Sequence, residues 1–191
     1  MSKYLIVFAH PSHEGHSGYL LAQIKERLEK ARADFEIIDL YQLNYDPTLK
    51  MSELYSADQK EVTDQNLDFQ NKIKVADRLL FIYPTWWQNM PAILKGFIDR
   101  VFTSGFGFIY FKGIPIGQLK NKKAAAFTSS GGPAIYTRFF TNSSSLRILL
   151  KHVLGFCGMQ TEGFLLGNAR KLEDNKERLN LMADKILAYL K

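Results

Sequence analysis

The residues YLIVFAHPSHEGHS, Tyr4 to Ser17, carry the clearest indication of the fold class of this chain. The run from Tyr4 to Ala9 is apolar throughout, is too short for a helix, and lacks the alternation of a half-exposed strand. Such a run is typical of a strand buried on both faces of a parallel sheet. A polar segment from His10 to Ser17 leads from it into leucines at helical spacing. The stretch therefore predicts a strand, a loop and a covering helix.

The same order repeats along the chain. Short apolar runs recur at 35–40, 78–83, 122–128 and 163–166, and apolar residues at helical spacing occur within 20–28, 92–101, 146–154 and 179–190. Five strands alternating with helices predict an α/β fold, a doubly wound five-stranded parallel sheet with helices on both faces. We expect one domain over residues 1–191, with the polar stretch 46–66 as a long excursion inside it.

The composition narrows the function classes. Cys157 is the only cysteine, so no intrachain disulfide can form, and the start of the chain does not read as a signal peptide. No apolar segment reaches the roughly 20 residues of a membrane span, and we expect a cytoplasmic protein. The net charge of +6 is scattered, without a dense basic run or zinc spacing, so we predict no nucleic-acid binding. A positive field equally favours anionic small molecules.

Three loops follow the carboxyl ends of predicted strands, which is where parallel sheets bind ligands. In the first, His10 to Ser17, the N–H groups at the start of a helix favour an anion, and His10 and Ser17 add polar groups. The loop has neither the three glycines of a dinucleotide fingerprint nor the Gly-Lys-Ser/Thr of a triphosphate loop. A flavin phosphate remains as the candidate ligand, and an ordinary turn with Ser17 as helix cap is the alternative, since serine is common at helix starts for structural reasons.

The first loop also carries three histidines and an acid, a composition that occurs in metal sites. His10, His13 and His16 would share one face only in a helix, and Pro11 argues against a helix here. The pattern also lacks cysteine partners and a distal ligand. We therefore predict no metal site.

The second loop is a short platform after the third strand of the predicted sheet. Pro84 fixes the backbone where that strand ends and leaves Thr85 to Asn89 as the platform. Trp86 and Trp87 supply wide apolar faces, while Gln88 and backbone amides supply polar contacts along an edge. A flat heteroaromatic ring needs this combination. The alternative is that the two tryptophans are core or interface residues.

The third loop runs from Ser129 to Tyr136. Gly131 and Gly132 permit close backbone approach, so their N–H groups can point at the electron-rich edge of a bound ring. Tyr136 can donate a hydrogen bond there. A simple turn is the alternative for this loop.

Several motifs resemble those of the NAD(P)H:quinone oxidoreductases of the flavodoxin-like fold, the DT-diaphorase-like family. They are LIVFAHPS at 5–12, DLYQLNYDP at 39–47, YPTWWQNMPAILKGFIDRVF at 83–102, GFGFIY at 105–110, SSGG at 129–132 and GFCGMQ at 155–160. The resemblance implies a homodimeric flavoenzyme with strand order 2-1-3-4-5. It also implies an NAD(P)H dehydrogenase (quinone) that uses FAD or FMN. Two electrons would pass from NADH or NADPH to a quinone-like, azo or nitroaromatic acceptor by a ping-pong hydride mechanism.

The resemblance assigns roles to individual residues. It implies that the flavin phosphates and ribityl chain are bound by His10, Ser17, Gly18 and Tyr19. It implies that the flavin ring is bound by Pro84, Thr85, Trp86, Trp87, Gln88, Ser129, Ser130, Gly131 and Gly132. Phe108 and Tyr110 match aromatics that line the acceptor pocket from the partner subunit. Tyr136 lies near a tyrosine that assists charge relay in the family.

Two departures from the family pattern affect the expected chemistry. Asn142 stands where relatives carry a histidine, and an amide can donate a hydrogen bond but cannot take up a proton near neutral pH. Any charge relay would then use Tyr136 or solvent as its acid, with Asn142 as a donor only. Gln88 stands where an aromatic or other residue often lies in relatives, so we expect a pocket more polar than theirs.

Two other functions fit the same motifs. Some relatives are regulatory ancillary flavoproteins of potassium efflux systems, and a basic protein can dock on an acidic partner. An electron carrier of the flavodoxin type is less compatible, because paired aromatics and a dimer pocket suit two-electron chemistry. The sequence leaves FAD against FMN, NADH against NADPH, and the natural acceptor open.

Overall fold

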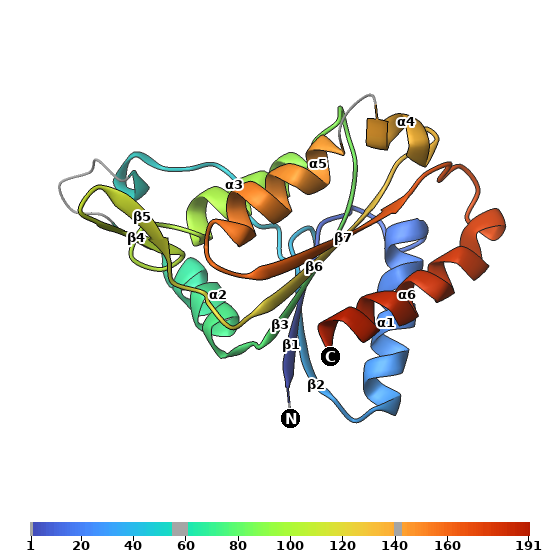
Figure 1. Cartoon of the computed structure of the whole chain (residues 1–191), viewed down its shortest axis with the longest axis horizontal. Helices are drawn as coiled ribbons and strands as arrows, with labels where there is room; N and C mark the ends of the chain where they lie inside the picture. The colour runs from blue at the N-terminus through green and yellow to red at the C-terminus, as the bar shows by residue number, and fades with distance from the viewer. Residues whose placement is uncertain (1, 55–60, 140–142) are drawn as a thin grey trace.

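The computed structural model describes residues 2–54, 61–139 and 143–191. Its centre is a five-stranded parallel sheet in the order β2-β1-β3-β6-β7 (Figure 1). The strands are β1 (Lys3–Phe8), β2 (Asp34–Asp39), β3 (Arg78–Pro84), β6 (Lys123–Ser129) and β7 (Gln160–Leu166). Counted along the sheet's own strands, this order is 2-1-3-4-5, so the predicted sheet and its order are confirmed.

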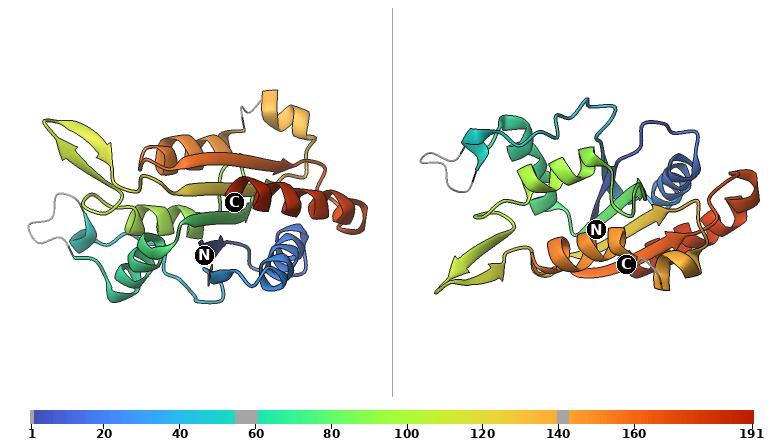
Figure 2. Two further views of the ribbon diagram at one scale, coloured as in Figure 1. Left: turned by 60° about the horizontal axis from the view of Figure 1, so that its bottom comes forward. Right: turned by 90° about the horizontal axis from the view of Figure 1, so that it is seen from above.

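Helices cover both faces of the sheet (Figure 2). On one face lie α1 (His16–Lys30) and α6 (Lys176–Leu190). On the other lie α2 (Asp64–Val75), α3 (Ala92–Val101), α5 (Ser144–Arg147) and the π-helical turn η2 (Ile148–Gly155) that continues α5. No helix among the described residues is long and apolar enough to cross a membrane.

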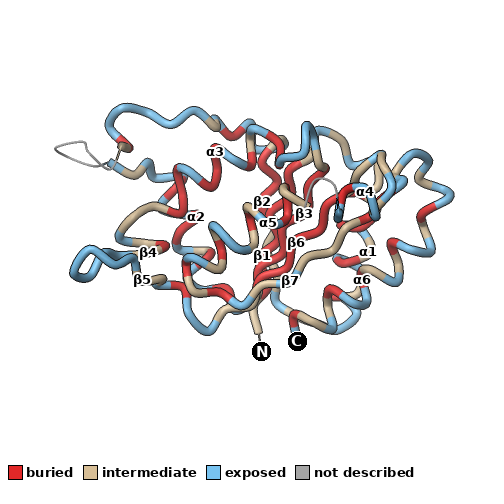
Figure 3. Tube along the Cα trace, turned by 45° about the horizontal axis from the view of Figure 1, so that its top comes forward, coloured by how far each residue is buried: buried red, intermediate tan, exposed pale blue. Residues whose placement is uncertain are grey.

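The strands read as continuous apolar runs because successive side chains enter two different cores. In β1, Leu5 and Val7 belong to the core under α2 and α3, whereas Ile6 and Phe8 belong to the core under α1 and α6. All four are at most 1% exposed. Buried residues follow the strands and the inward faces of the helices (Figure 3).

Some elements differ from the sequence prediction. Helix α2 was not predicted, because two of its four buried residues, Asn66 and Gln70, are polar and hide the apolar period. A hairpin of β4 (Phe108–Phe111) and β5 (Ile114–Gly117) is additional, and it projects from one side of the molecule (Figure 1). Short helices α4 (Ala134–Phe139), η1 (Met51–Glu53) and η3 (Glu173–Asn175) were also not predicted. The third loop therefore ends in a helix, and Tyr136 is helical.

Candidate functional site

A cavity of about 250 Å³ lies at the carboxyl ends of β1, β3 and β6. All three predicted loops contribute to its wall. Its lining residues are His10, Gly15, His16, Ser17, Pro84, Thr85, Trp86, Ser129, Ser130, Gly131 and Ala169. Ala169 comes from the loop after β7, which carries no motif of its own in the sequence, although the rule that ligands bind at strand carboxyl ends covers that loop too.

The first loop places a buried hydroxyl at the start of α1. The helix cap is Gly15, and no side chain caps the helix, so the interpretation of Ser17 as a capping residue is wrong. Ser17 lies in the first turn, is 2% exposed, and its Oγ has no hydrogen-bond partner within the described residues. Leaving such a group unpaired costs about 1–3 kcal/mol. A phosphate group at this helix end would satisfy the hydroxyl and the first backbone N–H groups together.

His10 offers the cavity only one of its ring nitrogens. Its Nδ1 lies 2.6 Å from the carbonyl oxygen of Ser12 and 3.0 Å from the Ser12 backbone nitrogen, so Nε2 remains for a ligand. The ring lies 6.2 Å from the Trp86 ring, between centroids. His13 instead pairs with Asp39 at 2.6 Å. Within the described residues, no three His, Cys, Asp or Glu side chains come together as metal ligands.

The second loop is a tight and strained turn. Trp86 N donates to Asn89 O at 2.9 Å, and Asn89 N donates to Trp86 O at 3.0 Å. The two residues between them, Trp87 and Gln88, have φ of 49° and 60°, which defines a type I′ turn. For residues other than glycine this left-handed conformation costs roughly 1–2 kcal/mol each. Trp86 is 42% and Trp87 100% exposed, so neither tryptophan belongs to the core of the chain.

Internal hydrogen bonds determine which backbone donors remain for a flat ring. Thr85 N is bonded to Ser129 O, and Ser130 N to Leu166 O, each at 2.8 Å. The Thr85 hydroxyl pairs with that of Thr128 at 2.8 Å. By contrast, the N–H groups of Trp87, Gln88 and Gly131 have no partner within the described part of the chain. A Cβ built on Gly131 would meet nothing within 4 Å, so the space beside it is open to a ligand.

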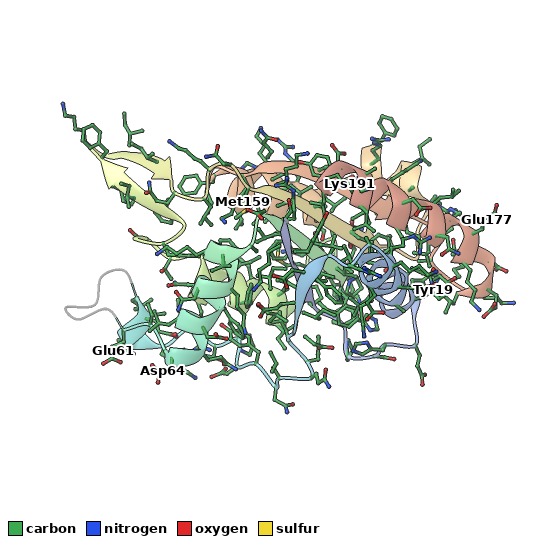
Figure 4. The ribbon with its side chains drawn as sticks, turned by 90° about the horizontal axis from the view of Figure 1, so that it is seen from below. Tyr19, Glu61, Asp64, Met159, Glu177 and Lys191 are labelled. Carbon is green, nitrogen blue, oxygen red and sulfur yellow. The ribbon has the colours of Figure 1, made fainter. Side chains whose placement is uncertain are left out.

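Two residues assigned to the flavin phosphates face other parts of the protein. A Cβ on Gly18 would lie 2.0 Å from His13 O, so the loop packs closely on the helix there. Tyr19 lies against α6, where its hydroxyl accepts from Asn180 Nδ2 at 3.2 Å and Lys176 Nζ lies 5.8 Å from its ring centroid (Figure 4). The structure does not bring Gly18 or Tyr19 to the cavity wall, and their flavin contacts stay predictions.

Of the expected catalytic and acceptor residues, Tyr136, Phe108 and Tyr110 are not among the residues that line this cavity. Tyr136 is 48% exposed on α4, and Asn142 lies outside the described residues. Phe108 and Tyr110 line a separate cavity of about 460 Å³ beside Glu53 and Asp99. The hairpin that carries them lies well apart from α4 (Figure 1). Within one copy of the chain, therefore, the aromatics of the expected acceptor pocket do not line the cavity at the strand ends.

The strained turn makes a prediction for stability. Gln88→Gly should raise the free energy of unfolding by about 0.5–1 kcal/mol, because glycine adopts positive φ without strain at a smaller entropic cost. Thermal unfolding should shift upward by about 2–4 °C per kcal/mol. Gln118→Gly is the matched control, since Gln118 is not among the positive-φ residues, and it should lower the melting temperature. A lower melting temperature for Gln88→Gly would contradict the assigned turn.

Comparison with known proteins gives close matches over nearly the whole chain. Residues 2–190 match the family model described as "Flavodoxin-like fold". An "Uncharacterized NAD(P)H oxidoreductase" of Haemophilus influenzae is 31% identical over 98% of this chain and 95% of its own length. Human "Ribosyldihydronicotinamide dehydrogenase [quinone]" is 30% identical over 95% and 87%. The solved structure of an NAD(P)H:quinone oxidoreductase from Methanothermobacter marburgensis is 26% identical, with a TM-score of 0.81 over 95% and 97%.

Proposed function

This chain belongs to the family of the flavodoxin-like fold, and we propose that it is a flavin-dependent NAD(P)H dehydrogenase (quinone) formed by a single domain. The observation that carries the proposal is the buried Ser17 hydroxyl, which lacks a partner in the described residues, in a residue that lines the cavity walled by three loops. The activities named for the relatives support the same reaction. They also favour catalysis over the regulatory role in a potassium efflux system.

The residues present fit a flavin mononucleotide portion, which FAD and FMN share. The first-turn N–H groups of α1 and the Ser17 hydroxyl would hold its phosphate. Trp86 would contact the ring, and the N–H groups of Trp87, Gln88 and Gly131 are the backbone donors left for its polar edge. When bound, the flavin supplies two-electron hydride chemistry. The protein's part is to position the ring and to keep one face open for donor and acceptor in turn.

If the donor and the acceptor use the same face of the flavin in turn, the steady-state kinetics should show it. NAD(P)H and a quinone such as menadione should give parallel lines in double-reciprocal plots of steady-state rates, because the oxidised donor leaves before the acceptor binds. Turnover should require added FMN or FAD when the protein is isolated without flavin. Intersecting lines would rule out the ping-pong order. Absence of NAD(P)H oxidation with both flavins and several quinones would reject the enzymatic proposal.

We predict a specific role for Tyr136. Its hydroxyl would donate a hydrogen bond to the flavin edge where negative charge develops on reduction, with Asn142 as a further donor. Tyr136→Phe should therefore lower the rate constant of flavin reduction by NAD(P)H more than it lowers flavin affinity. Stopped-flow absorbance measures the first quantity, and equilibrium titration measures the second. Unaltered reduction combined with lost flavin binding would contradict this assignment.

A homodimer would complete the acceptor pocket. The hairpin exposes Tyr110, Phe111 and Ile114 at 54%, 59% and 66%, an apolar surface that a partner subunit can cover. Phe108 and Tyr110 would then reach the cavity of the other subunit. Sedimentation should give twice the 21.9 kDa chain mass, and the paired change Phe111→Glu with Ile114→Glu should produce monomers without quinone turnover. Fully active monomers would contradict this part of the proposal.

A further inference from the structure

One hydrogen bond ties the strained 86–89 turn to a distant segment. Ser144, the first residue of α5, donates its Oγ to Gln88 O at 2.6 Å. The two residues are 56 positions apart in sequence. The side chain of Ser144 is thus the one element outside the second loop that holds the tip of this turn, within the described residues.

This bond completes the fixation of one peptide group. The Gln88 carbonyl accepts from Ser144, and the N–H on the other side of the same peptide, that of Asn89, donates to Trp86 O. Asn89 Oδ1 in addition accepts from Met90 N at 2.8 Å. In this hydrogen-bonded arrangement, the Trp87 and Gln88 N–H groups stay without partners among the described residues.

The anchor itself is fixed to the sheet. Ser145 and Leu146, which follow Ser144, are 3% and 7% exposed. Tyr83 in β3, directly before the second loop, donates its hydroxyl to Ser145 O at 3.3 Å. Burial raises the pKa of the Tyr83 hydroxyl, which keeps it protonated as a donor. Both ends of the contact between turn and helix are thereby attached to the same strand.

We propose that Ser144 is a positioning residue for the flavin: its hydroxyl holds the 86–89 turn in the conformation that presents the Trp87 and Gln88 N–H groups to the ring. Left-handed conformations at two residues other than glycine persist only where surrounding contacts over-determine them. The Ser144 bond is the contact that the rest of the fold adds at the tip of this turn. The effect of Ser144 on flavin binding rests on the proposed function. Its effect on the conformation of the turn does not.

The first test needs no flavin. Trp86 and Trp87 are the only tryptophans of the chain, so tryptophan fluorescence reports on this turn alone. In a Trp87→Phe background, Trp86 is the sole tryptophan, and its time-resolved anisotropy, excited at a wavelength that tyrosine does not absorb, measures nanosecond motion of the turn. Ser144→Ala should increase the amplitude of the fast local component, and Ser144→Thr should restore it. Ser143→Ala is the matched control, because the Ser143 side chain makes no capping bond.

The second test measures flavin binding with both tryptophans present. Ser144→Ala should weaken the binding of FMN or FAD about two- to tenfold, the usual contribution of one hydrogen bond. Ser144→Thr should recover most of the affinity, and Ser143→Ala should bind like the unaltered protein. Circular dichroism and the melting temperature would confirm that each variant is folded.

The outcomes separate the two parts of the inference. An unchanged fast component in Ser144→Ala overturns the hold on the turn. A looser turn with unchanged flavin affinity overturns the positioning role and leaves the proposed function standing. If the unaltered protein binds neither flavin, the proposed function fails and the positioning role fails with it, while the fluorescence still decides whether Ser144 holds the turn.

Discussion

Ser17→Ala should weaken FMN binding about 10- to 150-fold without destabilising the flavin-free protein. The loss corresponds to one hydrogen bond to a charged group, about 1.5–3 kcal/mol. The stability of the flavin-free protein should stay the same or rise, because the change removes a buried hydroxyl that no described residue satisfies. Calorimetric titration gives the affinity, and thermal unfolding gives the stability. A loss of FMN affinity without a loss of stability distinguishes a ligand-binding hydroxyl from a structural one.

Two controls sharpen this prediction. Riboflavin has the same ring and no phosphate, so its weaker binding should change little in Ser17→Ala. Ser12→Ala removes a hydroxyl of the same loop that already accepts from Glu14 N at 3.1 Å, and it should leave FMN affinity nearly unchanged. Equal losses for riboflavin and FMN, or a clear drop in the melting temperature of Ser17→Ala, would remove Ser17 from the phosphate site.

Glu53→Gln should destabilise the protein by about 3–5 kcal/mol, because it leaves a buried guanidinium without its counter-charge. Glu53 and Arg100 are both 6% exposed. Arg100 Nε lies 3.0 and 2.9 Å from the two carboxylate oxygens, and its Nη1 donates to Asp46 O. Asn66 also donates to Glu53, at 3.2 Å. This network attaches the excursion after β2 to α3, so the melting temperature should fall by about 2–4 °C per kcal/mol.

An exposed ion pair provides the control for Glu53. Arg27 Nε lies 2.7 Å from Asp184 Oδ1, with the Asp184 side chain 62% exposed, and such pairs contribute at most about 1 kcal/mol. Asp184→Asn should therefore change the melting temperature little. Chemical denaturation of both variants measures the free energies directly. A loss below 1 kcal/mol for Glu53→Gln would mean that the excursion is held by packing rather than by this ion pair.

The sheet was predictable because its evidence is local. Each strand buries side chains in two cores, which produces a continuous apolar run. Helix α2 escaped prediction because Asn66 and Gln70 are buried through specific bonds: Tyr45 donates to Asn66 Oδ1 at 2.9 Å, and Gln70 donates to Val101 O at 2.9 Å. Burial raises the pKa of Tyr45 to about 12, so it remains a donor. Partners so distant in sequence leave no periodic pattern.

The candidate site was likewise predictable in part from the sequence. The rule for parallel sheets located the three loops, and the structure brings His10, Ser17 and Gly131 to one cavity. The turn type was not predictable, because type I′ turns favour Asn-Gly and here contain Trp87 and Gln88. The fold itself requires a glycine at position 18, because His13 approaches it closely. Motif matching alone does not distinguish this packing requirement from contact with a ligand.

Anaerobic absorbance spectroscopy of the protein reconstituted with FMN and, separately, with FAD tests the central claim most directly. We predict that the protein retains at least one flavin after desalting, that NADPH or NADH bleaches its visible band, and that a quinone restores the band in a second step. A protein that retains neither flavin, or a bound flavin that neither nicotinamide reduces, would contradict the proposed oxidoreductase function.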